Sequence, residues 1–238
     1  MPAGAGNDSS SREIVNALLK ISEAITSDLY LDDILKLIVN VTAETLGSKI
    51  CSLMLLDPGK QELTIKATQS ISKEYINKNP LKVGEGIAGK VVLENEPLAV
   101  ENILECENYK FKDIAVKEGL VSMLSVPLHL KNKVIGALNI YTSSPHKFTD
   151  YEISILSTVA DQAAIVIENY RLVVETQVIK EELQTRKSVE KAKGVIMKEL
   201  SISEDEAFKK IQKFAMDNRK TMREVADAIV LSNAMKKI

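Results

Sequence analysis

The feature that most constrains the fold is one long stretch without helix-breaking residues. From Asp150 to about Leu200 the sequence contains no proline, and its single glycine, Gly194, lies near the far end. Because proline and glycine interrupt helices most strongly, this stretch predicts one continuous helix. We expect this helix to connect two separately folded parts of the chain.

Apolar residues recur every seven positions along this stretch. Ile165, Leu172 and Ile179 are seven residues apart, and Leu183 follows four residues after Ile179. This spacing is typical of a coiled coil, in which a polar seam residue such as Asn169 can fix the register of a parallel dimer. We therefore expect a homodimer, and the alternative is that this face packs on the preceding domain.

The part before the long helix changes its hydrophobic period. The helical stretches are residues 11–27 and 31–46, and the strand-like runs are residues 50–56, 62–68, 121–130 and 133–141. Asp-Pro-Gly-Lys separates the first two runs, which is turn chemistry and predicts a hairpin. The order predicts an α+β domain, an antiparallel sheet with helices on one face, after a disordered tail over residues 1–10.

Several motifs of this front part resemble the GAF domain. They are VGEGIAG at 83–89, EGL at 118–120, SMLSVPL at 122–128, VIGALNI at 134–140, FTDYE at 148–152 and AAIVIEN at 163–169. The resemblance implies a six-stranded sheet, a ligand pocket on one face and dimerisation through terminal helices. We assign residues 11–169 to this sensor domain. It senses an unidentified small molecule or redox state, or it is purely structural and has no ligand.

The glycines of the first motif have a structural explanation. Gly84, Gly86 and Gly89 satisfy a GxGxxG pattern, but no strand–helix–strand unit surrounds them, so a dinucleotide site is not expected. We expect them to allow a tight turn and a close approach of a helix to the sheet.

Composition excludes several classes of protein. Two cysteines and two histidines are too few for a disulfide framework or a multi-histidine metal site. There is no Ser-His-Asp arrangement, metal motif or phosphate loop, so we expect no enzyme and no cofactor. The sequence also lacks an apolar run of membrane-spanning length and a secretory signal, which favours the cytoplasm.

Charge is divided unevenly along the chain. Residues 184–238 carry 13 Lys/Arg and 8 Asp/Glu, a net charge of +5, whereas residues 1–183 carry a net charge of −7. An acidic body with a basic end is typical of a sensor joined to a nucleic-acid-binding module.

The basic end predicts three short helices. The first continues from the long helix, and the second and third begin at Ser203 and Thr221, each with a glutamate three residues later. This spacing is that of the capping box, in which side chains satisfy the free amides at a helix start. The inner faces are rich in alanine, and Phe208 and Phe214 are expected in the core between the helices.

Residues 186–232 resemble the ANTAR domain. The resemblance rests on AKGVIM at 192–197, EAF at 206–208, Ala215-Met216 and Val225-Ala226. It implies an all-α three-helix bundle that binds tandem stem-loop RNA in nascent transcripts and prevents transcription termination. We assign residues 186–238 to this bundle and residues 170–185 to a connecting coiled coil.

The candidate RNA-binding residues are mostly cations on the outer faces of these helices. They are Lys187, Lys191, Lys193, Gly194, Lys198, Arg219, Lys220 and Arg223. Lysine and arginine pair with RNA phosphates, and a guanidinium can stack on an unpaired base. A glycine inside a helix costs about 1 kcal/mol relative to alanine, so Gly194 indicates close helix packing or close approach of an RNA backbone.

The sequence therefore predicts a signal-responsive, RNA-binding transcription antitermination regulator. Two alternatives remain open. Three basic helices can also enter the major groove of DNA, which would make the protein a DNA-binding regulator. The terminal bundle can otherwise serve as a protein-interaction module.

Overall fold

The computed structural model describes residues 31–131 and 133–236, and these form two compact units that divide between Tyr170 and Arg171. The units are considered separately below. The predicted tail over residues 1–10 and the predicted helix over residues 11–27 lie outside the described residues.

The first unit is built on a six-stranded antiparallel sheet. The strands are β1 (Ile50–Asp57), β2 (Glu62–Thr68), β3 (Leu81–Lys82), β4 (Leu98–Val100), β5 (Ser122–Leu130) and β6 (Lys133–Thr142). Their order across the sheet is β3-β2-β1-β6-β5-β4. Both predicted hairpins, β1–β2 and β5–β6, are confirmed, as is the six-stranded sheet that the GAF resemblance implied.

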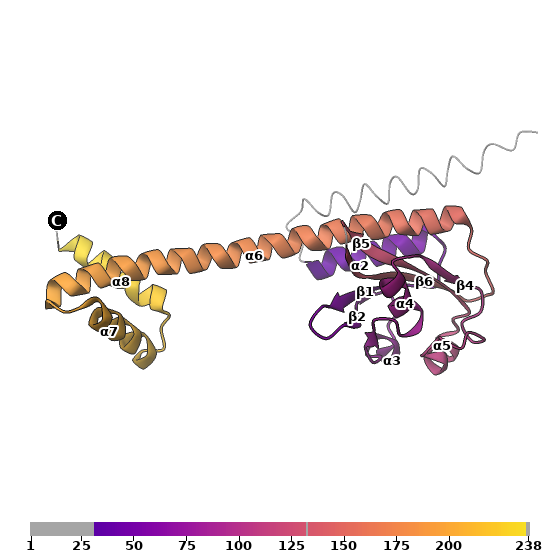
Figure 1. The fold of residues 1–238 in the computed structure, drawn as a ribbon, viewed down its shortest axis with the longest axis horizontal. Coiled ribbons are helices and arrows are strands. Elements are labelled where there is room, and N and C mark those ends of the chain that lie inside the picture. Colours follow the sequence, from indigo (N-terminus) through magenta and orange to yellow (C-terminus); the bar gives the residue numbers. More distant parts are fainter. Residues whose placement is uncertain (1–30, 132, 237–238) are drawn as a thin grey trace, which may run out of the picture. The chain divides into compact units, whose positions relative to one another are not determined.

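One face of the sheet is covered by two helices. These are α2 (Leu31–Thr45) and the first part of α6 (Asp150–Leu200), which lie along the same side of the strands (Figure 1). Cys51 and Leu53 of β1 pack into the core between these helices and the sheet. The long proline-free stretch therefore forms the single continuous helix that was predicted.

The opposite face is covered as well, which corrects the prediction that helices lie on one face. Ile50 and Met54 alternate with Cys51 and Leu53 along β1, so this strand is apolar on both sides and needs a cover on each. The second cover consists of the short helices α3 (Lys73–Ile76), α4 (Gly86–Glu94) and α5 (Lys112–Glu118), together with the loops between them.

A buried hydrogen-bond network crosses the middle of this second face. The Tyr75 hydroxyl donates to Ser52 Oγ at 3.1 Å, and Ser125 Oγ donates to Asn139 Oδ1 at 2.7 Å. Asn139 Nδ2 in turn donates to the Ser52 backbone oxygen at 3.3 Å. These links satisfy polar side chains that would be costly to bury alone.

The glycine-rich motif has the structural role that the sequence predicted. Gly84 and Gly86 adopt positive φ angles of 82° and 65°, which form the turn into α4. A side chain at Gly89 would collide with the backbone oxygen of Lys82 in β3, so only glycine allows α4 to lie this close to the sheet edge.

The second unit consists of the C-terminal part of α6, α7 (Glu204–Asp217) and α8 (Met222–Met235). Both predicted capping boxes are present, at Ser203–Glu206 and Thr221–Glu224. A small core holds the helices together, formed by Val189, Ala192, Ile211, Ala215, Val225 and Ala226. The three-helix bundle is therefore confirmed.

Candidate nucleic-acid interface

Two of the predicted lysines and the glycine lie together in one groove of the helical unit. Lys191, Gly194 and Lys198 of α6 line this groove, and Val230 and Asn233 of α8 form its other side. Its volume is about 400 Å³. We call it the lysine groove.

The lysines of this surface are free to bind an external anion. Lys191 and Lys198 are exposed, and so is Lys187, which lies one turn before Lys191 on the same helix. Within residues 31–131 and 133–236, none of the three forms an ion pair. Their positive charge is therefore not neutralised by carboxylates of the bundle.

Gly194 faces open space. A side chain built at this position would meet no atom within 4 Å, so close packing between helices of the bundle does not explain the glycine. Of the two explanations offered by the sequence, close helix packing is therefore excluded, and close approach of an RNA backbone stays a prediction. Gly194 lies one helical turn from both Lys191 and Lys198, between the two charges.

Lys193 has a different environment from its neighbours. Only 8% of its surface is exposed, and its ammonium pairs with Glu190 at 2.7 Å and Glu204 at 2.6 Å. The hydrogen bonds that this ammonium donates to Glu190 and Glu204 raise the pKa of Lys193. Lys193 therefore links α6 to the start of α7 through its ion pair with Glu204. It does not line the lysine groove.

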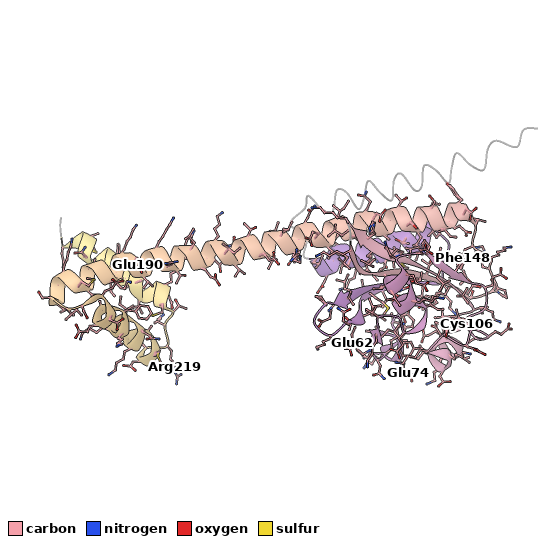
Figure 2. The ribbon with its side chains drawn as sticks, in the orientation of Figure 1. Glu62, Glu74, Cys106, Phe148, Glu190 and Arg219 are labelled. Atoms are coloured by element: carbon pink, nitrogen blue, oxygen red, sulfur yellow. The ribbon has the colours of Figure 1, made fainter. Side chains whose placement is uncertain are left out.

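The three predicted cations around the α7–α8 turn lie at the other end of α8. Lys220 Nζ is 3.4 Å from Glu224, and Arg223 Nε is 3.6 Å from Asp227, so both cations lie close to acidic residues of α8. Arg219 adopts a positive φ of 52° in the turn and is exposed (Figure 2). About 15 Å of helix separates Arg223 from Asn233 at 1.5 Å per residue, so these cations form a second surface.

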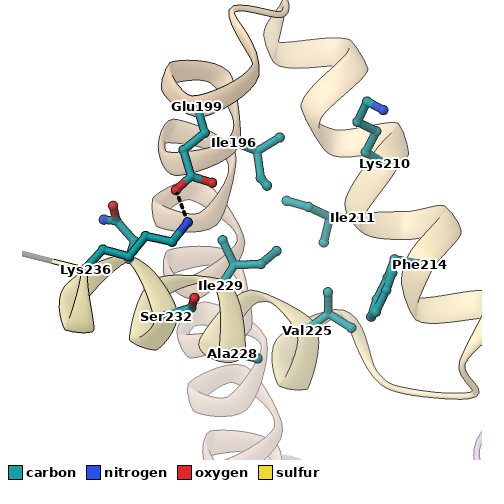
Figure 3. Close-up of a pocket in the computed structure, with 11 residues that line it drawn as sticks. Ile196, Glu199, Lys210, Ile211, Phe214, Val225, Ala228, Ile229, Ser232 and Lys236 are labelled. Carbon is teal, nitrogen blue, oxygen red and sulfur yellow. Dashed lines mark hydrogen bonds and ion pairs between the residues drawn. The ribbon is translucent and has the colours of Figure 1, made fainter.

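An apolar pocket opens on the bundle beside the lysine groove. Its volume is about 390 Å³, and Glu199 and Asn233 line both cavities. Ile211, Phe214 and Ile229 form its apolar wall, and a Lys236–Glu199 ion pair of 2.8 Å closes one side (Figure 3). We call it the Phe214 pocket.

Phe208 and Phe214 are not core residues, and this corrects the sequence prediction. Phe214 is 58% exposed and Phe208 is 40% exposed. The buried row of α7 is Ala207, Ile211 and Ala215, spaced four residues apart, and each phenylalanine lies beside that row. This regular four-residue spacing was the sequence signal that could have distinguished the buried residues of α7 from the two phenylalanines beside them.

The two phenylalanines face different electrostatic surroundings. Phe208 lines an open groove in which three glutamates, Glu181, Glu182 and Glu190, outnumber the two cations Arg186 and Lys193. Phe214 shares its pocket with Lys210 and Lys236. Because like charges repel, a polyanion is disfavoured beside Phe208 and favoured beside Phe214.

Two broader structural findings bear on function. No helix among the described residues is long and apolar enough to cross a membrane. In the same part of the chain, no group of three or more histidine, cysteine, aspartate or glutamate side chains is arranged to hold a metal ion.

Comparison with known families matches both units. Residues 29–168 match the GAF domain family, and residues 177–230 match the ANTAR domain family. The transcriptional regulatory protein PdtaR of Mycobacterium tuberculosis is 45% identical over 56 residues, which cover 24% of this chain and 27% of that protein.

The front unit has relatives among larger proteins. The methyl sulfide methyltransferase-associated sensor of Methanosarcina acetivorans is 30% identical over 164 residues, covering 66% of this chain and 16% of the relative. The Nif-specific regulatory protein of Herbaspirillum seropedicae is 27% identical over 172 residues, covering 69% and 31%. The chain thus spans less than a third of the length of these curated relatives.

Solved structures agree on the fold. The GAF domain of a phosphoenolpyruvate-protein phosphotransferase from Coxiella burnetii superposes with a TM-score of 0.62 at 26% identity, covering 69% of this chain and 98% of that one. A free methionine-R-sulfoxide reductase from Neisseria meningitidis has a TM-score of 0.58 at 18% identity, covering 67% and 91%. The fold, the motifs and the matched ranges together show that the chain belongs to the GAF family and continues into an ANTAR domain, which makes it a GAF–ANTAR regulator.

Proposed function

We propose that this protein is a signal-responsive transcription antitermination regulator that binds stem-loop RNA through the lysine groove. The observation that carries the proposal is that two lysines without ion-pair partners, Lys191 and Lys198, lie on either side of Gly194, which faces open space. It is supported by the ANTAR match over residues 177–230. In this proposal the protein is a regulator and not an enzyme.

The chemistry of the groove suits an RNA backbone. Lys191 and Lys198 can neutralise adjacent phosphates, and the missing side chain at Gly194 lets the sugar-phosphate chain approach the helix. The amide of Asn233, on the opposite wall, can both donate to and accept from a base edge. Single-stranded loops expose such edges, whereas the deep major groove of duplex RNA hides them.

The proposal includes a second copy of the chain along α6. Leu172, Ile179 and Leu183 are exposed on this helix, and their spacing of seven and then four residues is that of a coiled-coil seam. A dimer would present two bundles to the two loops of a tandem stem-loop target. The GAF domain would alter this pairing when it binds its small molecule.

The test is fluorescence anisotropy of the full chain with a tandem-hairpin RNA and a length-matched duplex DNA, across a salt titration. The Lys191→Gln/Lys198→Gln variant should bind RNA at least tenfold more weakly. The slope of log affinity against log salt should shrink by roughly 0.7 to 0.9 for each phosphate that the variant no longer neutralises. Lys209→Gln/Lys213→Gln on α7 makes the same charge change elsewhere and should have little effect.

The same assay separates the alternatives. Equal or stronger binding to duplex DNA would favour a DNA-binding regulator, and no binding to either nucleic acid would favour a protein-interaction module. Replacement of Arg219 and Arg223 by alanine tests the second cationic surface. If that variant binds RNA more weakly while the α6 double variant does not, the interface lies at the α7–α8 turn and not in the lysine groove.

A further inference from the structure

A seam of exposed residues runs along α6 within the second unit. Its members are Leu172, Thr176, Ile179 and Leu183. The steps between them are four, three and four residues, as between the core positions of a coiled-coil heptad. All four side chains are exposed, so the described part of the chain leaves the seam uncovered. The next position in this spacing is Arg186, which is charged, so the apolar seam ends at Leu183.

Each side of the seam carries charge of a single sign. Glu175 and Glu182 form one flank. Lys180 and Lys187 form the other, and the members of each pair are seven residues apart. These are the g and e positions of the heptad, which border the core of a coiled coil on its two sides. All four side chains are exposed, so a neighbouring helix can reach them.

This distribution of charge favours one orientation of a second copy. In a parallel pair, a g residue of one helix lies near the e residue five positions later on the other helix. Glu182 would then face the partner's Lys187, and Glu175 would face the partner's Lys180. In an antiparallel pair, e residues face e residues and g residues face g residues. Lysine would then lie opposite lysine and glutamate opposite glutamate, and like charges repel.

Glu182 and Lys187 are free to form such a pair. Within residues 31–131 and 133–236, neither side chain takes part in an ion pair or a side-chain hydrogen bond. Glu175 differs, because it already pairs with Arg171 of its own helix at 2.6 Å. Lys187 also lies outside the lysine groove. A carboxylate on a second copy would therefore give this lysine a partner that its own chain does not supply.

We propose that the second copy binds α6 in parallel and in register, and that Glu182 of each copy pairs with the partner's Lys187. This inference rests on the proposed function, which requires two copies along α6 but sets no orientation. Each bundle is built on the C-terminal part of α6. A parallel pair therefore places both bundles at the same end of the paired helices, where one RNA with two loops can reach both.

The first test reverses these charges in the full chain and measures dimer affinity by sedimentation equilibrium without RNA. Glu182→Lys and Lys187→Glu should each weaken the dimer by about tenfold, because each brings like charges together twice in a symmetric pair. The double variant Glu182→Lys/Lys187→Glu restores opposite charges and should return the affinity to within about threefold of the unmodified chain. These differences should shrink at high salt, which screens exposed charges.

Glu181→Lys is the matched control for the charge reversal. It makes the same change of charge as Glu182→Lys, but position 181 lies on the side of the helix away from the seam. Its dimer affinity should stay close to that of the unmodified chain. The proposal is wrong if the double variant is as weak as the single variants, or if Glu181→Lys and Glu182→Lys weaken the dimer equally.

A cysteine cross-link tests orientation and register directly. Thr176→Cys is made in a Cys106→Ser chain, in which the one remaining native cysteine, Cys51, is buried. A parallel, in-register pair brings position 176 of both copies face to face, so mild oxidation should give a disulfide-linked dimer on a non-reducing gel. A disulfide needs Cα atoms within about 7 Å, and an antiparallel pair places a different seam position opposite residue 176.

Gln177→Cys in the same chain is the control, because the next residue along the helix points away from the seam. A cross-link at neither position, or equally at both, would overturn the parallel pairing. Both tests are made without RNA, so they are independent of the lysine groove. A chain that binds the tandem-hairpin RNA but gives no cross-link at position 176 would keep the proposed function and reject this orientation.

Discussion

Adjacent residues on α6 have opposite roles. Lys193 is nearly buried and held by Glu190 and Glu204, whereas Gly194 opens onto the lysine groove. One residue step turns a helical side chain by about 100°, so a lysine that pairs with α7 and a glycine that faces open space can be neighbours in sequence. Composition of the segment alone would have treated all five α6 lysines as equivalent.

Gly194→Ala should change stability and RNA binding in opposite directions. The free energy of unfolding should rise by about 1 kcal/mol, because alanine favours helix and its methyl group meets no atom within 4 Å. RNA affinity should fall, because the methyl group occupies the path proposed for the backbone. Chemical denaturation and anisotropy measure the two effects, and unchanged affinity in the stabilised variant would place the RNA elsewhere.

The two exposed phenylalanines should differ in their contribution to RNA binding. Phe214→Leu keeps an apolar wall but removes an aromatic face on which an unpaired base can stack, an interaction worth about 1–3 kcal/mol per base. Its RNA affinity should therefore fall about five- to a hundredfold. Phe208→Leu is the matched control, because the acidic side chains of its groove outnumber the basic ones and phosphate is less favoured there. Equal decreases in both variants would indicate a general packing effect.

Only part of the lysine groove could be predicted from the sequence. Lys187, Lys191 and Lys198 could be placed on one side of a helix from their spacing alone. That these charges are free, and that Lys193 is paired with Glu204, depends on which acidic residues the other helices bring near. Val230 and Asn233 carried no sequence signal, because their role comes only from the crossing of α8 over α6.

At the scale of elements, the hydrophobic period and turn residues predicted the hairpins, the lack of helix breakers predicted the long helix, and the capping boxes predicted the last two helices. None of these signals predicted that both faces of the sheet are covered. Helices α3, α4 and α5 have 4, 9 and 7 residues, too short for a periodic pattern to stand out. The apolar residues on both sides of β1 were the available signal.

The exposed seam of α6 leads to a prediction about oligomeric state. Ile179→Lys/Leu183→Lys places charges in the proposed coiled-coil seam and should convert a dimer into a monomer, as measured by analytical ultracentrifugation. Val174→Lys is the control, because Val174 is also exposed but lies away from the seam. A monomeric unmodified chain, or a dimer that survives the double substitution, would contradict the proposed pairing.

At the scale of the whole molecule, the two units have separate cores and should unfold separately. Leu124 is buried in the GAF core and Ile211 in the core of the bundle. Replacing either large side chain by alanine should cost about 2–5 kcal/mol in its own unit only. Differential scanning calorimetry should show two transitions, with Ile211→Ala lowering one midpoint and Leu124→Ala the other. A single transition shifted by both variants would mean that α6 couples the units into one cooperative block.

The strand order also has a consequence for synthesis on the ribosome. The central pairing of the sheet joins β1 to β6, and its partners Ile50 and Tyr141 are roughly ninety residues apart in the chain. The sheet therefore cannot close until β6 has emerged, and α6 must follow to cover it. At about 5–20 residues per second, residues 171–238 then take roughly 3–14 s more. The GAF domain can therefore complete its fold before the helices of the proposed RNA-binding bundle have been synthesised.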